Sequence, residues 1–383
     1  MYLPAWFIYK NYKDIPVKTE SEFSKLENGN YYIKYTFGVA IMQSPFFLGA
    51  HILNTTFDWY PADGYSKIYQ KGIFFSAVFY CFLGLLSLFY LLRDITDFYS
   101  AVLVTATVFL GTNLLFYTLH APGMSHVYSF FLITLFVSIV YRQGLSFLSR
   151  SLLPSALIFG LLFLIRPLNI LVLLYPLSLL FFKYTRWAHR WKFVKKNFTK
   201  AIILILPAIL LLALNIIEWS KMKGSLQLYS YTNEGFIYWK DPRILKVLFD
   251  IQNGFFIYAP AMLLSIVGII KYYKSKIDIR IFGWLILIYS YFFGSWWAWW
   301  FGGAYGHRSY VDLLVFFSIP IAMLLHGIKR SKNKFSYYAI HFYLVVSILY
   351  SVRMTKLYVS PWDGPSWTID RYLGEVAKAF FFY

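Results

Sequence analysis

Long apolar runs separated by short polar connections repeat along almost the whole chain. Several runs reach the roughly 17 to 25 residues that a helix needs to cross a hydrocarbon core of about 30 Å. The pattern therefore predicts an all-α fold, a polytopic bundle of about ten transmembrane helices. We expect these spans at residues 71–92, 98–119, 126–141, 153–165, 168–182, 201–219, 255–270, 281–297, 309–328 and 337–352.

The apolar run 153–182 is interrupted by the sequence Ile165-Arg166-Pro167. Proline breaks a helix interior because it lacks an N–H donor and its ring clashes with the preceding turn. We therefore expect two short spans here, and one long kinked helix is the alternative. Two spans also keep the basic stretch 183–200 on the same side of the membrane as the other basic loops.

An apolar segment near the beginning, residues 36–53, contains Pro45 and is bounded by Lys34 and His51. The segment has to begin and end on the external side of the membrane, so that the basic loops that follow all lie on the cytoplasmic side. We expect this segment to be re-entrant or interfacial.

Basic residues are concentrated in alternate connections. The loops 93–97, 142–150, 183–200, 271–280 and 329–336 hold 18 of the 36 Lys and Arg residues but only three of the 17 acidic residues. By the positive-inside rule these loops are cytoplasmic. Both ends of the chain are then external, and we expect a multi-pass protein of the bacterial inner membrane.

This topology predicts three regions: an external loop with interfacial helices at 1–70, the bundle at 71–352 and an external tail at 353–383. An external loop before the first span has no apolar segment to export it. We therefore expect one more span before Met1, which raises the count to about eleven.

Composition agrees with the membrane assignment and narrows the chemistry. Hydrophobic residues make up 59% of the 383 positions and charged residues 14%. The net charge of +19 follows from the basic loops, so we expect no nucleic acid partner. Cys81 is the single cysteine, which excludes a disulfide framework and a thiolate metal site. No nucleotide-binding or zinc motif is found, and we expect no cofactor, although a divalent metal stays open.

Two arginines are candidates for binding an anion. Arg308 follows His307 and a glycine-rich stretch, where both cations can be anchors at a span end or can bind phosphate. Arg166 lies deeper, where a central unpaired arginine costs roughly 2.5 to 3.5 kcal/mol on insertion scales. Its charge therefore has to contact water, a carboxylate or a ligand phosphate. Alternatively, Arg166 is a structural residue whose side chain extends to the membrane interface.

Other polar and aromatic residues have a structural and a functional interpretation. Trp299, Trp300 and their neighbours can form an interfacial belt, or a platform for a sugar or a polyprenyl chain. His126 can cap its span or contact a ligand. Asp58 and Asp63 are weak candidates for a general base or a metal ligand, since both lie in turn sequences that favour aspartate by themselves.

Four stretches resemble a known family: KYTFGVAIMQSPFF at 34–47, GMSHVYSFF at 123–131, LIRP at 164–167, and NGFFIYAP with WWFGGAYGHRSYVDLL at 253–260 and 299–314. They resemble the GT-C membrane glycosyltransferases that use polyprenyl-phosphate sugars, in the branch of protein mannosyltransferases and lipid A sugar transferases. The resemblance covers nearly the full chain with loose motifs.

The resemblance implies transfer of a sugar from a polyprenyl-phosphate donor to an acceptor hydroxyl of a lipid, glycan or protein on the external face. It implies phosphate binding by His307, Arg308, Arg166 and Lys34, and sugar or lipid contacts by Trp299, Trp300, Tyr305 and His126. The catalytic acid expected in the first external loop has no matching position, so we expect it upstream of Met1.

Three other functions remain open. A transporter or lipid flippase would use Arg166 and the break at Pro167 as a substrate site, although no inverted repeat is visible. An O-antigen polymerase or ligase would have a similar topology. A truncated homologue would bind lipid without catalysis.

Overall fold

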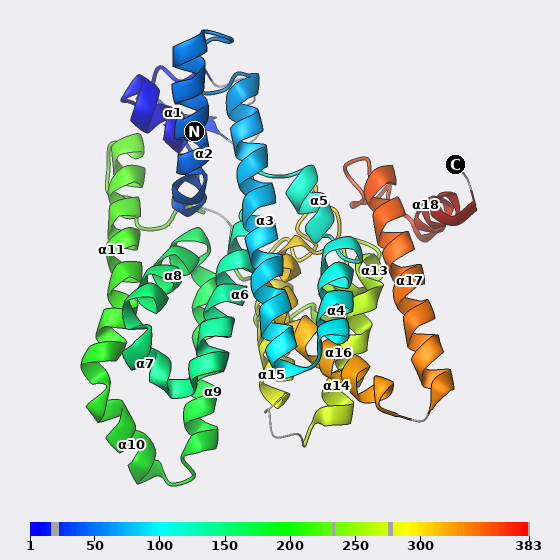
Figure 1. Cartoon of the computed structure of the whole chain (residues 1–383). Helices are drawn as coiled ribbons and strands as arrows, with labels where there is room; N and C mark the ends of the chain where they lie inside the picture. Colours follow the sequence, from blue (N-terminus) through cyan, green and yellow to red (C-terminus); the bar gives the residue numbers. More distant parts are fainter. Residues whose placement is uncertain (17–22, 232–233, 275–278, 332, 382–383) are drawn as a thin grey trace. The chain divides into compact units, whose positions relative to one another are not determined.

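The structure is a computed structural model that describes residues 1–16, 23–231, 234–274, 279–331 and 333–381 (Figure 1). Within these residues the strands are β1 (Ser24–Lys25) and β2 (Tyr31–Tyr32), an antiparallel pair with Ser24 opposite Tyr32. The remaining elements are helices. The prediction of an all-α fold is confirmed.

The chain divides into two compact units. Unit 1 comprises Met1–Tyr80, Pro122–Leu132 and Arg142–Glu234, and unit 2 comprises Cys81–Ala121, Ile133–Tyr141 and Gly235–Tyr383. Two helices, α3 (Lys67–Ile95) and α6 (His126–Gln143), contribute to both units.

Unit 1 is built around the pairing of α8 with α11. A Cβ on Gly160 would come within 2.8 Å of Pro207 Cβ, so a glycine is needed where these two helices approach each other. The helical elements that lie wholly in unit 1 are α1 (Tyr2–Pro4), the π-helical turn η1 (Ala5–Tyr9), α2 (Gly38–Phe57), η2 (Gly144–Ser146), α7 (Phe147–Arg150), α8 (Leu152–Ile165), η3 (Pro167–Leu173), α9 (Leu174–Lys183), α10 (Trp187–Lys196) and α11 (Phe198–Lys223).

The predicted break at Arg166 is confirmed. α8 ends at Ile165, Arg166 is extended with φ −150° and ψ 114°, and Pro167 begins the 3₁₀-helix η3. The chain then reverses, because α9 contacts the turn η2 that precedes α8 (Figure 1). The alternative of one long kinked helix over 153–182 is therefore wrong.

Unit 2 is built around α16, whose side chains are largely buried against α14, α4, α15 and α17. A Cβ on Gly268 of α14 would come within 2.3 Å of the Pro320 carbonyl oxygen, so α14 and α16 are in close backbone contact. The helical elements that lie wholly in unit 2 are α4 (Phe98–Leu110), α5 (Leu114–Leu119), α12 (Ile244–Phe249), α13 (Phe255–Tyr258), η4 (Pro260–Leu263), α14 (Leu264–Tyr272), α15 (Arg280–Ser295), η5 (Arg308–Leu313), α16 (Leu314–Lys329), α17 (Lys334–Leu357) and α18 (Ile369–Phe381).

All ten predicted spans correspond to helical segments, but their lengths differ. In the described chain five helical stretches are long and apolar enough to cross a membrane: Lys67–Ile95, His126–Arg150, Phe198–Lys223, Arg308–Lys329 and Lys334–Leu357. Shorter apolar helices cover Phe98–Leu110, Leu152–Ile165, Pro167–Lys183 and Pro260–Tyr272. The described chain is thus helical with five candidate membrane spans, and the count of ten stays a prediction.

The predicted re-entrant or interfacial segment 36–53 forms most of α2, which continues through Pro45 without a break. A re-entrant segment has to reverse direction, and α2 does not reverse within its 20 residues. The interfacial alternative therefore suits this helix better.

Loops that should lie on one side of a membrane meet each other within each unit. In unit 1, Lys200 Nζ donates to Ser149 Oγ at 2.6 Å, which joins two basic connections. In unit 2, Lys329 Nζ lies 3.3 Å from Asp97 Oδ1, which joins the connections at 93–97 and 329–336. Alternate connections therefore pair in each unit, as an up-and-down helical arrangement requires.

Candidate functional site

Two predicted site residues of unit 1, Lys34 and Arg166, lie on segments that a hydrogen bond of Thr36 joins. Thr36 Oγ1 donates to the carbonyl of Leu164 near the end of α8, and the Phe37 N–H donates to Asn215 Oδ1 of α11 at 2.9 Å. The segment 34–37 therefore connects the end of α8 with α11, directly before α2 begins.

Arg166 contacts His126 beside this segment. Arg166 Nη1 lies 3.3 Å from His126 Nδ1. Because a guanidinium can only donate, His126 Nδ1 is the acceptor and the ring of this tautomer carries its proton on Nε2. His126 is buried at the start of α6, whereas Arg166 is half-buried. Two residues that the sequence singled out separately thus lie together.

Lys34, the other predicted cation of unit 1, forms an ion pair with Glu234 at 2.5 Å. Its ammonium group also lies 5.2 Å from the centre of the Tyr231 ring. Both partners of the ion pair are partly exposed, with side-chain exposures of 35% and 28%. An anionic ligand that binds Lys34 therefore has to replace a carboxylate that water already reaches.

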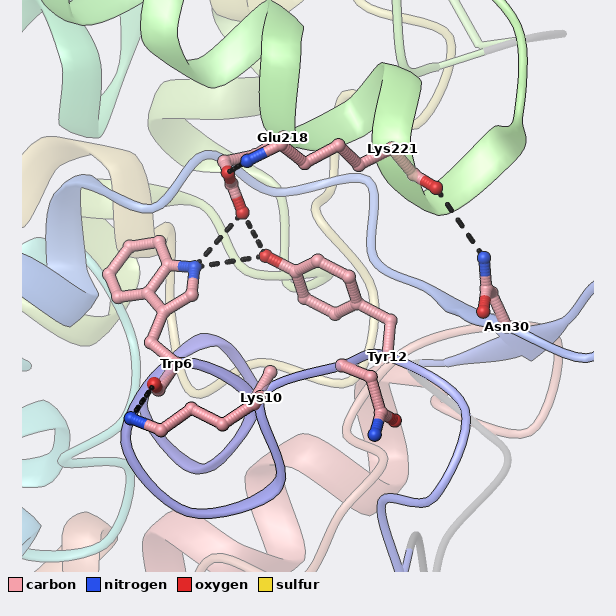
Figure 2. A pocket seen from close by; sticks show the side chains of 8 residues that line it. Trp6, Lys10, Tyr12, Asn30, Glu218 and Lys221 are labelled. Atoms are coloured by element: carbon pink, nitrogen blue, oxygen red, sulfur yellow. Dashed lines mark hydrogen bonds and ion pairs between the residues drawn. The ribbon is translucent and has the colours of Figure 1, made fainter.

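A polar pocket of about 410 Å³ lies at the end of α11 (Figure 2). Its central group is Glu218, whose Oε2 accepts hydrogen bonds from Trp6 Nε1 at 2.9 Å and from the Tyr12 hydroxyl. Lys221 Nζ donates to Glu218 Oε1 at 2.8 Å. The lining residues are Ala5, Trp6, Lys10, Asn11, Tyr12, Asn30, Glu218 and Lys221.

Trp6, which lines the Glu218 pocket, packs against the segment 34–37. The carbonyl of Tyr35 accepts a hydrogen bond from Tyr2 at 2.7 Å, and the Trp6 ring meets the Phe37 ring edge-to-face with centroids 5.3 Å apart. Burial, together with the nearby Glu218 carboxylate, raises the pKa of Tyr12, so Tyr12 keeps its proton and donates. A carboxylate beside an indole, a phenol and two amides suits a ligand rich in hydroxyl groups.

Sequence reasoning missed Glu218. It lies in the last residues of a predicted span and precedes Lys221, which is typical of residues that anchor a helix end. Its partners Trp6 and Tyr12 are 212 and 206 residues away, and only the fold brings them together. An acid so close to an apolar run is the one signal that the sequence offered.

In unit 2, His307 is a buried side chain surrounded by aromatic rings. Its ring lies 5.3 Å from Phe293 and 4.9 Å from Tyr310 between centroids, and Nε2 lies 3.1 Å from the Trp299 carbonyl oxygen. Arg308 is partly exposed and lies over the Phe301 ring at 5.5 Å. Arg308 is therefore the more accessible cation of the predicted pair.

Three aromatic residues of unit 2 were predicted to contact a ligand. Tyr305 is fully buried, and its backbone carbonyl accepts from Tyr117 at 3.2 Å. Trp299 is nearly buried with Lys246 over its ring, whereas Trp300 is partly exposed. Trp300 is thus the most accessible of the three.

Asp58 and Asp63 have roles in turns. Asp58 ends α2 with a positive φ of 52°. Asp63 Oδ1 accepts from the backbone N–H groups of Tyr65 at 2.8 Å and Ser66 at 2.7 Å, which forms an Asx-turn. These contacts favour the structural interpretation of both residues.

Among the described residues, no cluster of three or more His, Cys, Asp or Glu side chains could hold a metal ion. The candidate functional side chains of unit 1 are those of Lys34, Arg166, His126 and Glu218. No protein family, curated protein or solved structure matches this chain.

Proposed function

We propose that the chain is a membrane glycosyltransferase that moves a sugar from a polyprenyl-phosphate donor to an acceptor hydroxyl. The observation that carries the proposal is the position of Arg166, at a helix break and 3.3 Å from His126. A guanidinium binds phosphate in a bidentate manner, and a histidine beside it fixes the direction of the fork.

The donor phosphate is bound by Arg166 and Lys34, on the two segments that Thr36 joins through Leu164. As the bond between the anomeric carbon and the phosphate oxygen breaks, negative charge develops on the leaving lipid phosphate. Two fixed cations stabilise that charge more in the transition state than in the ground state. No nucleotide is needed, because the activated donor supplies the free energy.

The acceptor hydroxyl binds in the Glu218 pocket. Its oxygen attacks the anomeric carbon, its proton passes to the Glu218 carboxylate, and the lipid phosphate leaves with the bonding electron pair. Trp6 and Tyr12 hold the carboxylate in place through their hydrogen bonds. In this proposal Glu218 is the proton acceptor of unit 1.

Unit 2 by itself provides an alternative set of candidates for binding a polyprenyl-phosphate donor. Arg308 is the phosphate contact that we favour there, with His307 positioned behind it, and Trp300 is the accessible aromatic surface for sugar or lipid. In this proposal Trp299 and Tyr305 support these residues from the core of unit 2.

The proposed topology has ten crossings in the bacterial inner membrane, with the basic loops in the cytoplasm. It is supported by the charge bias and by the pairing of alternate connections within each unit. The Glu218 pocket then faces the periplasm together with the first residues of the described chain.

Sugar transfer tests the proposal. The full chain in lipid nanodiscs is given radiolabelled polyprenyl-phosphate hexoses and pentoses, and release of polyprenyl phosphate is measured with membrane glycolipids as acceptors. We expect acceptor-dependent release that is lost in Arg166→Gln and kept in Arg150→Gln, a change of the exposed arginine at the end of α7. Release that is the same in all three proteins would contradict the proposal.

A transporter is the second candidate, because the helix break at Arg166 and Pro167 is typical of transporter substrate sites. It predicts movement of the lipid-linked sugar across vesicles without cleavage of its phosphate bond. The same donors reconstituted in vesicles distinguish the two functions.

A further inference from the structure

Unit 1 contains a second pocket, of about 420 Å³, at the other end of α8 from Arg166. It is lined by Lys183, Lys192, Lys196 and Lys200 together with the hydroxyl of Ser149. The 14 residues of α8 separate it from Arg166 by about 21 Å at 1.5 Å per residue. It is therefore a separate feature from the proposed transfer site.

The four lysines line one pocket, and the described lining residues offer them no carboxylate counter-ion. The sequence contains no Asp or Glu between Asp97 and Glu218, and no carboxylate is among the described residues that line the pocket. Lys200 donates to Ser149 Oγ at 2.6 Å, which fixes its ammonium group at one side of the pocket. An anion would relieve the repulsion among these cations and accept several charge-assisted hydrogen bonds.

Two of the four lysines, Lys192 and Lys196, lie on one face of α10. His189, Lys192 and Lys196 follow one another at spacings of three and four residues and line the pocket. Trp187 and Trp191 lie on another face, with exposures of 68% and 51%. Exposed tryptophans beside lysines are typical of a helix that lies in the headgroup region of a bilayer.

The neighbouring helices supply apolar surface for acyl chains. Phe181 of α9 is 49% exposed, and Ile202 of α11 is 49% exposed. Phe181 precedes the pocket residue Lys183 by two positions and Ile202 follows the pocket residue Lys200 by two, so both helices carry exposed apolar side chains close in sequence to the pocket.

We propose that this pocket binds the headgroup of an anionic phospholipid. Its phosphate lies among Lys192, Lys196 and Lys200, and its acyl chains follow α9 and α11. The membrane lipid, rather than a soluble anion, is favoured by the exposed tryptophans of α10 and by the apolar surface beside the pocket. The inference does not depend on the proposed glycosyl transfer.

The test measures lipid binding to the full chain in neutral detergent by native mass spectrometry, with cardiolipin as the probe and phosphatidylcholine for comparison. The variant Lys192→Gln/Lys196→Gln removes two pocket cations. The matched control Arg186→Gln/Lys195→Gln removes two cations from the same segment that do not line the pocket. Equal thermal stability of the three proteins shows that each is folded.

We expect wild-type protein to bind cardiolipin more than tenfold tighter than phosphatidylcholine. The pocket variant should lose about thirtyfold in cardiolipin affinity and the control about threefold or less. Equal losses in both variants would overturn the proposal, because diffuse surface charge then explains the binding. Complete displacement of cardiolipin by millimolar inorganic phosphate would also overturn it, in favour of a site for small anions. Even without any variant, equal affinity of the wild-type protein for the two lipids is incompatible with the proposal.

Discussion

Arg166 Nη1 lies 3.3 Å from His126 Nδ1, although the two residues are 40 positions apart in the chain. Arg166 directly follows α8 and His126 begins α6, so the ends of two helices meet at this contact. The histidine accepts and the arginine donates, which aims the guanidinium without neutralising it. This contact gives the guanidinium a defined direction at the point where α8 ends.

Substitution of His126 should weaken donor binding through Arg166. His126→Ala removes the acceptor at Nδ1, whereas the amide oxygen of His126→Asn can replace it. A hydrogen bond to a charged group is worth about 1.5 to 3 kcal/mol. We expect at least a tenfold loss of polyprenyl-phosphate affinity in the alanine variant and less than threefold in the asparagine variant. Equal losses in both would show that His126 has only a packing role.

Glu218 should affect turnover rather than donor binding. Removal of a general base typically lowers a rate by about 10² to 10⁴. We expect Glu218→Gln to reduce sugar transfer by this amount with unchanged donor affinity. Tyr12→Phe removes one of the hydrogen bonds to the carboxylate and should reduce transfer by about tenfold. Full activity of Glu218→Gln would exclude its role as proton acceptor.

The Lys34–Glu234 ion pair should matter for ligand binding more than for stability. Partly exposed ion pairs contribute about 0 to 1 kcal/mol to folding, so neither Lys34→Gln nor Glu234→Gln should change the melting temperature much. Lys34→Gln should weaken donor binding by about threefold to tenfold. Glu234→Gln should strengthen it, because the competing carboxylate is gone. Weaker binding in both variants would mean that the intact ion pair is what the donor recognises.

Asp97 should stabilise unit 2 at neutral pH. It accepts from the backbone N–H groups of Tyr99 and Ser100 as the N-cap of α4 and pairs with His326 and Lys329. Partial burial opposes its ionisation, but hydrogen bonds from His326, Ser100 and Lys329 outweigh burial and lower the pKa of Asp97.

A lowered pKa in the folded state means that this stabilisation is fully present above the unfolded pKa of about 3.9 and is lost as the pH falls below it. Asp97→Ala should destabilise the protein by about 1 to 2 kcal/mol at pH 7, and Asp97→Asn by less, since asparagine also caps helices. Thermal unfolding at pH 7 and pH 3.5 measures both effects. A larger effect of Asp97→Ala at pH 3.5 than at pH 7 would contradict this assignment.

Sequence reasoning located the helices because an apolar run or a proline determines the conformation of its own segment of the chain. It located the break at Arg166, which the structure confirms, because Pro167 cannot continue a helix. It did not show whether α2 turns back at Pro45, since a proline in the first half of a helix can be accommodated by a kink. Nor could it show that His307 is enclosed by aromatic rings, which depends on the packing of unit 2.

The site was predictable only in part for the same reason. Arg166 was conspicuous as a charge in an apolar run, and His126 as a histidine at the start of a span. Their contact, and the pairing of Glu218 with Trp6, join segments that are distant in the sequence. Such pairings follow from tertiary structure, and no local pattern encodes them.

The most direct test of phosphate recognition at Arg166 compares binding of a polyprenyl monophosphate with binding of the same polyprenol. The full chain is measured in nanodiscs, with Arg166→Gln and the control Arg150→Gln alongside. We predict that wild-type protein and the control prefer the phosphate at least tenfold, and that Arg166→Gln loses this preference while it remains folded. An undiminished preference for the phosphate in Arg166→Gln would contradict the account.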